Sequence, residues 1–179
     1  MTPRQTEGPF YFDPRLTRAD IAEDRSGVPL RLRLQVVEAK GCAPATGARV
    51  DIWHCDADGV YSGYAREGAA DAAWLRGTQL ADAEGIVAFE TIYPGWYSGR
   101  AVHIHCKAWL TDGREITSQL YFPDELTDQI HARPPYAQRG QRRRRNDDDG
   151  IFRRAGGAAM LDMRGNPDGH LGSVVIALS

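Results

Sequence analysis

Two histidines, His103 and His105, occupy alternate positions of the segment 93–109, which reads YPGWYSGRAVHIHCKAW. If this segment is a strand, side chains two residues apart lie on the same face, one pleat repeat from each other. Two imidazoles placed in this way can bind one metal ion as neighbouring ligands. The same spacing also suits a pair of buried, hydrogen-bonded histidines, so the pair by itself leaves both interpretations open.

A metal ion would need further ligands close to the two histidines. In a regular strand Cys106 points to the opposite face from His105. The nearby carboxylates belong to strand ends or turns and do not clearly converge; they are Glu90, Asp112 and Glu115. With the cysteine and the carboxylates set aside, tyrosine is the remaining type of ligand. Tyr97 directly follows a Pro-Gly-Trp turn, and Tyr61 follows a second, glycine-containing turn.

Tyrosine ligands also specify the kind of metal. A phenol has a pKa near 10, so it becomes a ligand only for a metal that is acidic enough to ionise it. A hard trivalent ion such as Fe(III) does this, whereas Zn(II) more usually takes Cys, His or Asp. Any single tyrosine is more often a core or surface aromatic, and only the combination with the histidine pair favours a ferric site.

The elements that must position these residues are predicted to be strands. Alternating or β-branched runs predict strands over 29–39, 48–55, 85–93, 100–110, 115–122 and 172–178. A hairpin turn at Thr111-Asp112-Gly113 joins two of them. A short helix is expected over 123–132, and one helical turn within 15–24. Short strands at near-regular spacing are typical of an all-β sandwich or barrel.

Length and composition bound the class of protein. With 179 residues and 42% hydrophobic content, the chain fits one domain, and no linker divides it. Its net charge of -2 argues against nucleic acid as the main partner. The basic run 142–145 is followed by Asp147, Asp148 and Asp149, and is interpreted as a solvated loop whose charge is cancelled locally.

The segment at the start of the chain and the cysteines bear on the compartment. No stretch approaches the roughly 20 apolar residues that span a bilayer, and residues 1–15 hold no apolar signal core. The default expectation is therefore a cytoplasmic protein, with export as the alternative if a leader was removed. Cys42 and Cys55 could form a disulfide in an oxidising compartment, but a total of three cysteines decides neither way.

Four segments resemble one known family. They are TEGPFY, GARVDIWHCDADGVYSGY, GTQLADAEGIVAFETIYPGWYSGRAVHIH and TSQLYFPDELTD. In this order they resemble the intradiol ring-cleaving dioxygenases, non-haem ferric enzymes of aromatic-compound degradation. That family includes catechol 1,2-dioxygenase and the β chain of protocatechuate 3,4-dioxygenase. The resemblance runs from about Thr6 to Asp128 and weakens after Pro134.

The resemblance implies a set of site residues. It makes Tyr61, Tyr97, His103 and His105 the Fe(III) ligands, with Tyr97 and His105 axial and a solvent-derived hydroxide in a fifth position. Tyr61 is preferred over Tyr64 because it matches the family's Gly-x-Tyr position. The implied catalytic residues are Tyr97, which accepts a substrate proton on release, and Arg100 and Gln119, which lie over the bound ring.

The resemblance also implies the fold, the reaction and the partners. The fold is a transthyretin-like β-sandwich with irregular loops, divided into an N-terminal arm (1–28), a core carrying the iron site (29–122) and a closing part (123–179). The arm segment 6–10 is expected to cover the pocket. The substrates are a catechol-type ring and O2, and the product is a muconate-type diacid. The short chain resembles the single-domain branch of the family, and a homo-oligomer is compatible with it.

Two other functions fit parts of the same sequence. One is a non-catalytic, transthyretin-like binding module, which the strand pattern alone does not reject. The other is a zinc-dependent hydrolase that combines the histidine pair with a carboxylate. Nothing in the sequence selects among catechol, hydroxyquinol and protocatechuate as the ring that is cleaved.

Overall fold

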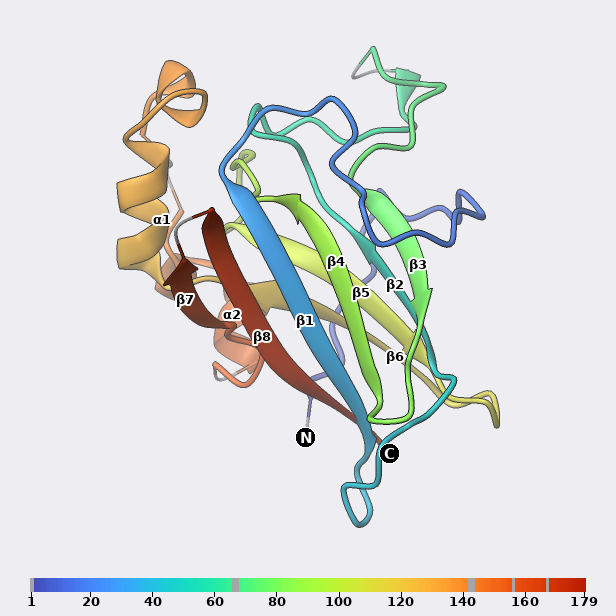
Figure 1. The fold of residues 1–179 in the computed structure, drawn as a ribbon. Coiled ribbons are helices and arrows are strands. Elements are labelled where there is room, and N and C mark those ends of the chain that lie inside the picture. Colours follow the sequence, from blue (N-terminus) through green and yellow to red (C-terminus); the bar gives the residue numbers. More distant parts are fainter. Residues whose placement is uncertain (1, 66–67, 142–143, 156, 167) are drawn as a thin grey trace.

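The computed structural model describes residues 2–65, 68–141, 144–155, 157–166 and 168–179. Eight strands form two four-stranded sheets, one in the order β4-β1-β8-β7 and the other in the order β3-β2-β5-β6 (Figure 1). The strands are β1 (Pro29–Glu38), β2 (Arg49–Trp53), β3 (Arg76–Leu80), β4 (Ile86–Ile92), β5 (His103–Trp109), β6 (Glu115–Tyr121), β7 (Asp162–Asn166) and β8 (Gly169–Leu178). The prediction of an all-β sandwich is confirmed.

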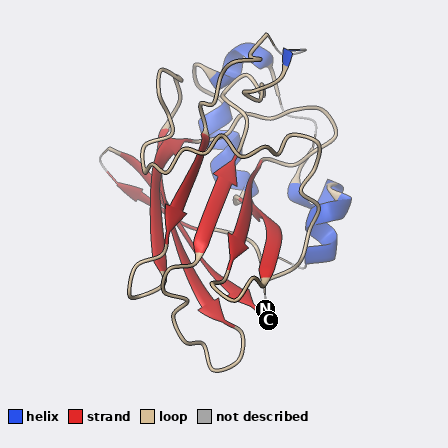
Figure 2. Ribbon diagram, turned by 90° about the vertical axis from the view of Figure 1, so that its right-hand side faces the viewer, coloured by secondary structure: helices blue, strands red, loops and turns tan. Residues whose placement is uncertain are grey.

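The helices of the described chain are short. They are α1 (Asp124–His131) and α2 (Gly150–Ala155), with 3₁₀ turns at Tyr136–Arg139 and Asn146–Asp148. Figure 2 shows them outside the two sheets. None of the described helices combines the length and the apolar character needed to cross a bilayer.

Strand β1 shows how the alternating pattern builds the core. Leu30, Leu32 and Leu34 are buried, whereas Arg31 and Arg33 between them are exposed. The strand pairs antiparallel with β4 and parallel with β8. Its leucines belong to one hydrophobic cluster that also takes side chains from the second sheet. Burial of this shared cluster holds the two sheets face to face.

The second sheet turns its other face toward the N-terminal arm. On β5, Ile104 and Cys106 join the core cluster, so His103 and His105 lie on the opposite face. Residues of the arm bind this outer face: Lys107 pairs with Glu7 at 2.9 Å. The alternation of β5 therefore places the histidine pair between the sheet and the arm.

Several local predictions were wrong. The segment 15–24 holds no helical turn, because its backbone pairs with the sheets: Arg18 N donates to Thr78 O and Ile21 N donates to Glu90 O. Strands β3 and β7 and helix α2 were not predicted. The disulfide that the cysteine count left open does not form; Cys42 is an exposed free thiol and Cys55 a buried one.

His54 is a buried residue that hydrogen-bonds within the fold and lies outside the histidine pair. Its Nδ1 lies 2.8 Å from the Cys55 carbonyl, which only accepts, so Nδ1 donates and Nε2 accepts from the Thr91 hydroxyl at 2.8 Å. Burial lowers the pKa of His54 to about 4. The folded state thus holds His54 neutral at pH values where the unfolded chain begins to bind a proton.

This difference predicts acid sensitivity. Between pH 6.5 and 4 the unfolded state binds more protons at His54 than the folded state, so stability falls as the pH falls through this window, by up to about 3 kcal/mol. Urea unfolding of the metal-free protein at a series of pH values measures the slope. His54→Gln is expected to reduce this slope by the share of His54, while His103 and His105, whose pKa values burial also lowers, keep the rest. An unchanged slope in this variant would show that His54 does not contribute.

Candidate metal centre

The two histidines meet at their Nε2 atoms. His103 and His105 are 2% and 1% exposed, and their Nε2 atoms lie 3.1 Å apart. The Nδ1 of His103 lies 2.7 Å from the carbonyl of Ala101. Because a carbonyl only accepts, Nδ1 carries the ring proton and Nε2 keeps its lone pair. The backbone therefore fixes the tautomer in which His103 can act as a ligand.

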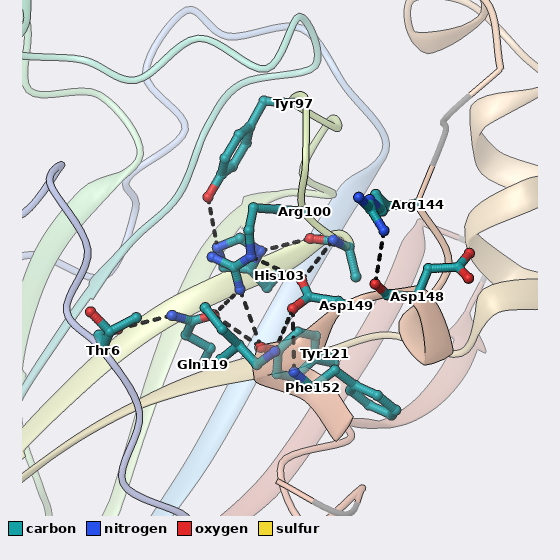
Figure 3. A network of polar contacts seen from close by, with 12 residues as sticks. Thr6, Tyr97, Arg100, His103, Gln119, Tyr121, Arg144, Asp148, Asp149 and Phe152 are labelled. Atoms are coloured by element: carbon teal, nitrogen blue, oxygen red, sulfur yellow. Dashed lines mark hydrogen bonds and ion pairs between the residues drawn. The ribbon is translucent and has the colours of Figure 1, made fainter. Parts of the chain in front are cut away.

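Both predicted tyrosines lie next to this pair. The Tyr97 hydroxyl is 3.1 Å from His103 Nε2 (Figure 3). The Tyr61 ring lies edge-to-face with Tyr97, at 5.7 Å between centroids, and 6.3 Å from the ring of His105. Tyr64 is separate from this group, because its hydroxyl donates to the carbonyl of Pro9. The structure thus brings together the four predicted ligands and leaves the neighbouring tyrosine out.

The Tyr61 hydroxyl is a buried polar group whose main polar neighbour is the Tyr97 phenol. It makes no well-formed hydrogen bond with any described residue, although its residue is 2% exposed. Buried polar groups are nearly always paired, and an unpaired one costs about 1–3 kcal/mol. Its strongest electrostatic neighbour is Tyr97. A buried hydroxyl without a well-formed hydrogen bond is suited to bind a metal ion.

The acid–base properties of the four side chains indicate a strongly charged cation. Burial raises the pKa of Tyr61 well above 10, and burial also raises that of Tyr97 to about 12, against the lowering effect of Arg100. Burial and the Arg100 charge lower the pKa of His103 to about 3. The imidazoles are therefore neutral. A buried phenolate, in contrast, forms only where a nearby positive charge offsets the cost of its desolvation. A hard trivalent ion such as Fe(III) fits this donor set.

A carboxylate-based zinc site does not fit the described residues. Among them, no three His, Cys, Asp or Glu side chains converge as a metal site would require. The three candidate acids are exposed and paired elsewhere: Glu90 with Arg31, Asp112 with Arg114 and Glu115 with Lys107. The histidine pair needs the two tyrosines to complete a ligand set.

Aromatic rings enclose the ligands. Trp53, opposite His105 in the β2–β5 register, stacks on its ring at 4.8 Å. Phe10 of the arm stacks on Tyr61 at 4.3 Å with nearly parallel planes. The arm can approach this closely at Gly8, where φ is +71° and a Cβ would meet the His105 ring at 3.4 Å. The expected cover of the pocket by residues 6–10 is thus present.

A buried guanidinium lies near the Tyr61 ring, and no sequence pattern predicted it. Arg76 is 1% exposed, with its guanidinium carbon 4.2 Å above the Phe12 ring and 6.0 Å from the Tyr61 ring. Its Nε donates to the Ser62 hydroxyl. Burial lowers the pKa of Arg76 to about 10, which leaves it charged at neutral pH. This positive charge favours a phenolate at Tyr61.

Arg100 and Gln119 are joined in one polar network (Figure 3). Gln119 is opposite His105 in the β5–β6 register, so it lies on the same outer face. Arg100 Nη2 donates to Gln119 Oε1, and Gln119 Nε2 donates to the carbonyl of Thr6 at 2.9 Å. Tyr121, opposite His103, donates its hydroxyl to Gln119 Oε1 at 2.9 Å. The two predicted residues are therefore held in fixed positions beside the ligand set.

The acidic run after residue 145 was interpreted as part of a solvated loop, but one of its residues is buried. Asp149 is buried and pairs with Arg100. Arg145 pairs instead with the carboxylates of helix α1, Asp124, Glu125 and Asp128. Arg142 and Arg143 lie outside the described residues.

Known proteins resemble most of this chain. A family model described as dioxygenase matches residues 6–142. A chlorocatechol 1,2-dioxygenase of a Pseudomonas species is 31% identical over 137 residues, which cover 65% of this chain and 53% of that protein. Catechol 1,2-dioxygenase 1 of Acinetobacter lwoffii is 28% identical over 142 residues, covering 66% and 45%. The chain therefore spans about half the length of these curated relatives.

Solved structures also match nearly the whole chain. An intradiol ring-cleavage dioxygenase from Tetranychus urticae superposes with a TM-score of 0.93 at 30% identity, covering 100% of this chain and 94% of that one. The dioxygenase domain of a dioxygenase carbohydrate-binding protein fusion from Streptomyces sp. SirexAA-E gives 0.78 at 30% identity, covering 99% and 97%. With the family match over residues 6–142 and the fold in agreement, the chain belongs to the intradiol ring-cleaving dioxygenase family.

Proposed function

We propose that this protein is an Fe(III)-dependent dioxygenase that cleaves a catechol-type ring between its two hydroxyl-bearing carbons, using O2, to give a muconate-type diacid. Family membership supports the reaction class. The observation that carries the proposal is the convergence of one buried phenol, one partly buried phenol and two neutral imidazoles on one point of the outer sheet face. The names of the two relatives specify chlorocatechol and catechol as their substrates, which supports a catechol-type substrate for this protein.

Tyr61, Tyr97, His103 and His105 would hold the iron. When bound, ferric iron supplies Lewis acidity toward the two oxygens of an ionised diol and makes the ring reactive toward O2. The protein holds the imidazoles neutral and in one tautomer, through burial and the Ala101 carbonyl. It also keeps water from the ligands with Phe10 and Trp53.

Tyr97 is suited to accept a proton from the substrate. Tyr61 is fully buried under Phe10, whereas Tyr97 is only partly buried and lies nearer to solvent. Outside a metal's influence the pKa of Tyr97 is about 12, because burial raises it, so its phenolate takes a proton from a diol hydroxyl readily. The oxygen that receives this proton is Tyr97 Oη.

Arg100 is suited to stabilise negative charge on the ring. Its guanidinium lies beside Tyr97 and is fixed by Gln119 and Tyr121 before any substrate binds. A preorganised cation of this kind stabilises charge that develops in the transition state without reorganising. Gln119, anchored on Thr6, limits the movement of the guanidinium.

A visible spectrum and a substrate panel test the proposal. The purified protein is expected to bind one iron per chain and to show a visible phenolate-to-iron charge-transfer band that a chelator removes. Oxygen uptake is expected with at least one of catechol, chlorocatechol, hydroxyquinol and protocatechuate, with both atoms of labelled O2 entering a diacid. A colourless protein that does not take up iron would favour a binding module, and activity restored only by Zn(II) would favour a hydrolase.

A further inference from the structure

We infer that Asp149 is a positioning residue of this site, whose carboxylate sets the direction of the Arg100 guanidinium and so makes helix α2 part of the catalytic apparatus. The inference rests on the proposed function in that Arg100 is taken to act on the bound ring. Asp149 follows the segment 6–142 that matches the family model.

The two oxygens of the Asp149 carboxylate accept hydrogen bonds from two different parts of the chain. Its Oδ2 accepts from Arg100 Nε at 2.9 Å and from the backbone N–H of Ala101 at 2.9 Å (Figure 3). Its Oδ1 accepts from the backbone N–H groups of Ile151 at 2.8 Å and Phe152 at 3.4 Å, in the first turn of α2. One carboxylate thus joins the start of α2 to the residues that lead into the histidine strand.

Burial makes this contact more than a surface ion pair. The side chains of Arg100 and Asp149 are 17% and 2% exposed. Burial alone would raise the pKa of Asp149, but the Ala101 amide and the Arg100 charge more than offset it, and the pKa is lowered. A buried charge-assisted hydrogen bond to Arg Nε has defined direction, in contrast to exposed pairs, which hold long side chains only weakly.

The remaining contacts of Arg100 show what Asp149 controls. Asp149 holds the Nε edge of the guanidinium, and Gln119 and Tyr121 hold Nη2. These contacts all use the Nε–Nη2 edge of the guanidinium. In this position its positive charge lowers the pKa of Tyr97. Without the carboxylate, the guanidinium would keep its Nη2 contacts and its neighbour Tyr97, which together restrain rotation of the planar group less. Loss of Asp149 is therefore expected to loosen Arg100 without removing its charge.

Asp149→Asn is the primary test. An asparagine can keep its oxygen toward Ile151 and Phe152, which preserves the helix cap, but its NH2 group then faces two donors, Arg100 Nε and Ala101 N. We expect kcat for the best catechol to fall about 10- to 100-fold, the range typical for partners that orient an active-site group, with a smaller change in KM. In an Arg100→Met background the same change is expected to add little, because the two residues act as a unit.

A second readout needs neither iron nor turnover. In the metal-free protein, the Nε–H resonance of Arg100, assigned by its loss in Arg100→Lys, is expected to exchange slowly with solvent and to lose this protection in Asp149→Asn. Asp149→Ser keeps a good helix cap while removing the carboxylate, so it should reproduce both effects if the asparagine variant folds poorly. Asp112→Asn is the matched control, because Asp112 Oδ2 pairs with Arg114 Nε at 2.7 Å on an exposed turn.

The outcomes separate this inference from the proposed function. A kcat within twofold of wild type in both Asp149 variants, or an Arg100 Nε–H that stays protected, would overturn the positioning role while ring cleavage stands. A wild-type protein that cleaves no catechol would overturn the proposed function, and the exchange experiment would still decide whether Asp149 fixes Arg100. A parallel loss of kcat in Asp112→Asn would also count against the inference.

Discussion

Replacing Tyr61 by phenylalanine is expected to abolish iron binding, or to weaken and shift the charge-transfer band to that of the single remaining phenolate, and to abolish ring cleavage. The variant removes one phenolate from the ligand set and leaves the aromatic ring in place under Phe10. Loss of a direct ligand should cost more activity than the about 10- to 100-fold that follows loss of a group that only orients a ligand. Iron content per chain, the visible spectrum and oxygen uptake measure the effect.

The same substitution should not destabilise the metal-free fold. The Tyr61 hydroxyl is buried without a well-formed hydrogen bond to any described residue, so removing it relieves a desolvation penalty of about 1–3 kcal/mol. We therefore expect equal or higher stability in urea unfolding of the metal-free variant. A stability gain together with loss of iron is the pattern of a residue kept for binding, and a large stability loss would contradict this.

Tyr64→Phe is the matched control. Tyr64 lies three positions further along the same loop, and its hydroxyl donates to the Pro9 carbonyl near the surface. Its removal should leave iron content and colour close to wild type. If Tyr64→Phe lost the iron and Tyr61→Phe kept it, the assignment of the two tyrosines would be reversed.

Local patterns were enough for the parts of the site that depend on short spacing. The alternation of β5 separates the histidines from Ile104 and Cys106, so one face carries ligands and the other packs in the core. Register then extends this face across the sheet, which brings Gln119 beside His105. Elimination of the other ligand types pointed to Tyr61 and Tyr97, and resemblance to a family selected Tyr61 over Tyr64. These tyrosines reach the strand from two different turns.

The missed elements lack such a pattern. Strand β3 reads RGTQL and contains a buried arginine and a glycine, so it shows no alternation. The segment 15–24 has helix-like composition, but its backbone donors find partners in two sheets far along the chain. Tertiary contacts outweigh local propensity in both cases.

Asp149 shows why part of the site could not be predicted from the sequence. In sequence it ends a run of acidic residues that balances a run of arginines, which favours a solvated loop. The residue before Gly150 could have been predicted as a helix cap from the pattern alone. Its partner Arg100 is 49 positions away, and only the folded chain brings the two together. Pairing between loops at this separation leaves no periodic signal in one sequence.

Replacing Arg100 by methionine is expected to lower kcat about 100- to 1000-fold while iron binding and colour persist. Arg100 lies against the phenol of Tyr97, whose pKa its charge lowers, and is fixed by Asp149, Gln119 and Tyr121. Arg100 is not itself one of the four predicted ligands, so its removal leaves the ligand set in place, whereas loss of one preorganised charge beside the reacting ring costs this much in rate. Stopped-flow oxygen uptake and the visible spectrum of the same sample separate the two roles.

Arg100→Lys distinguishes charge from geometry. Lysine keeps the charge but has no planar fork, so it cannot bind Asp149 and Gln119 at once, and it should recover only part of the lost rate. Removing the guanidinium also leaves the Asp149 carboxylate buried without its charged partner, so Arg100→Met combined with Asp149→Asn should be more stable than Arg100→Met alone. If Arg100→Met retained wild-type kcat and lost its iron instead, the guanidinium would belong to the metal site, and stabilisation of the ring would have to come from another group.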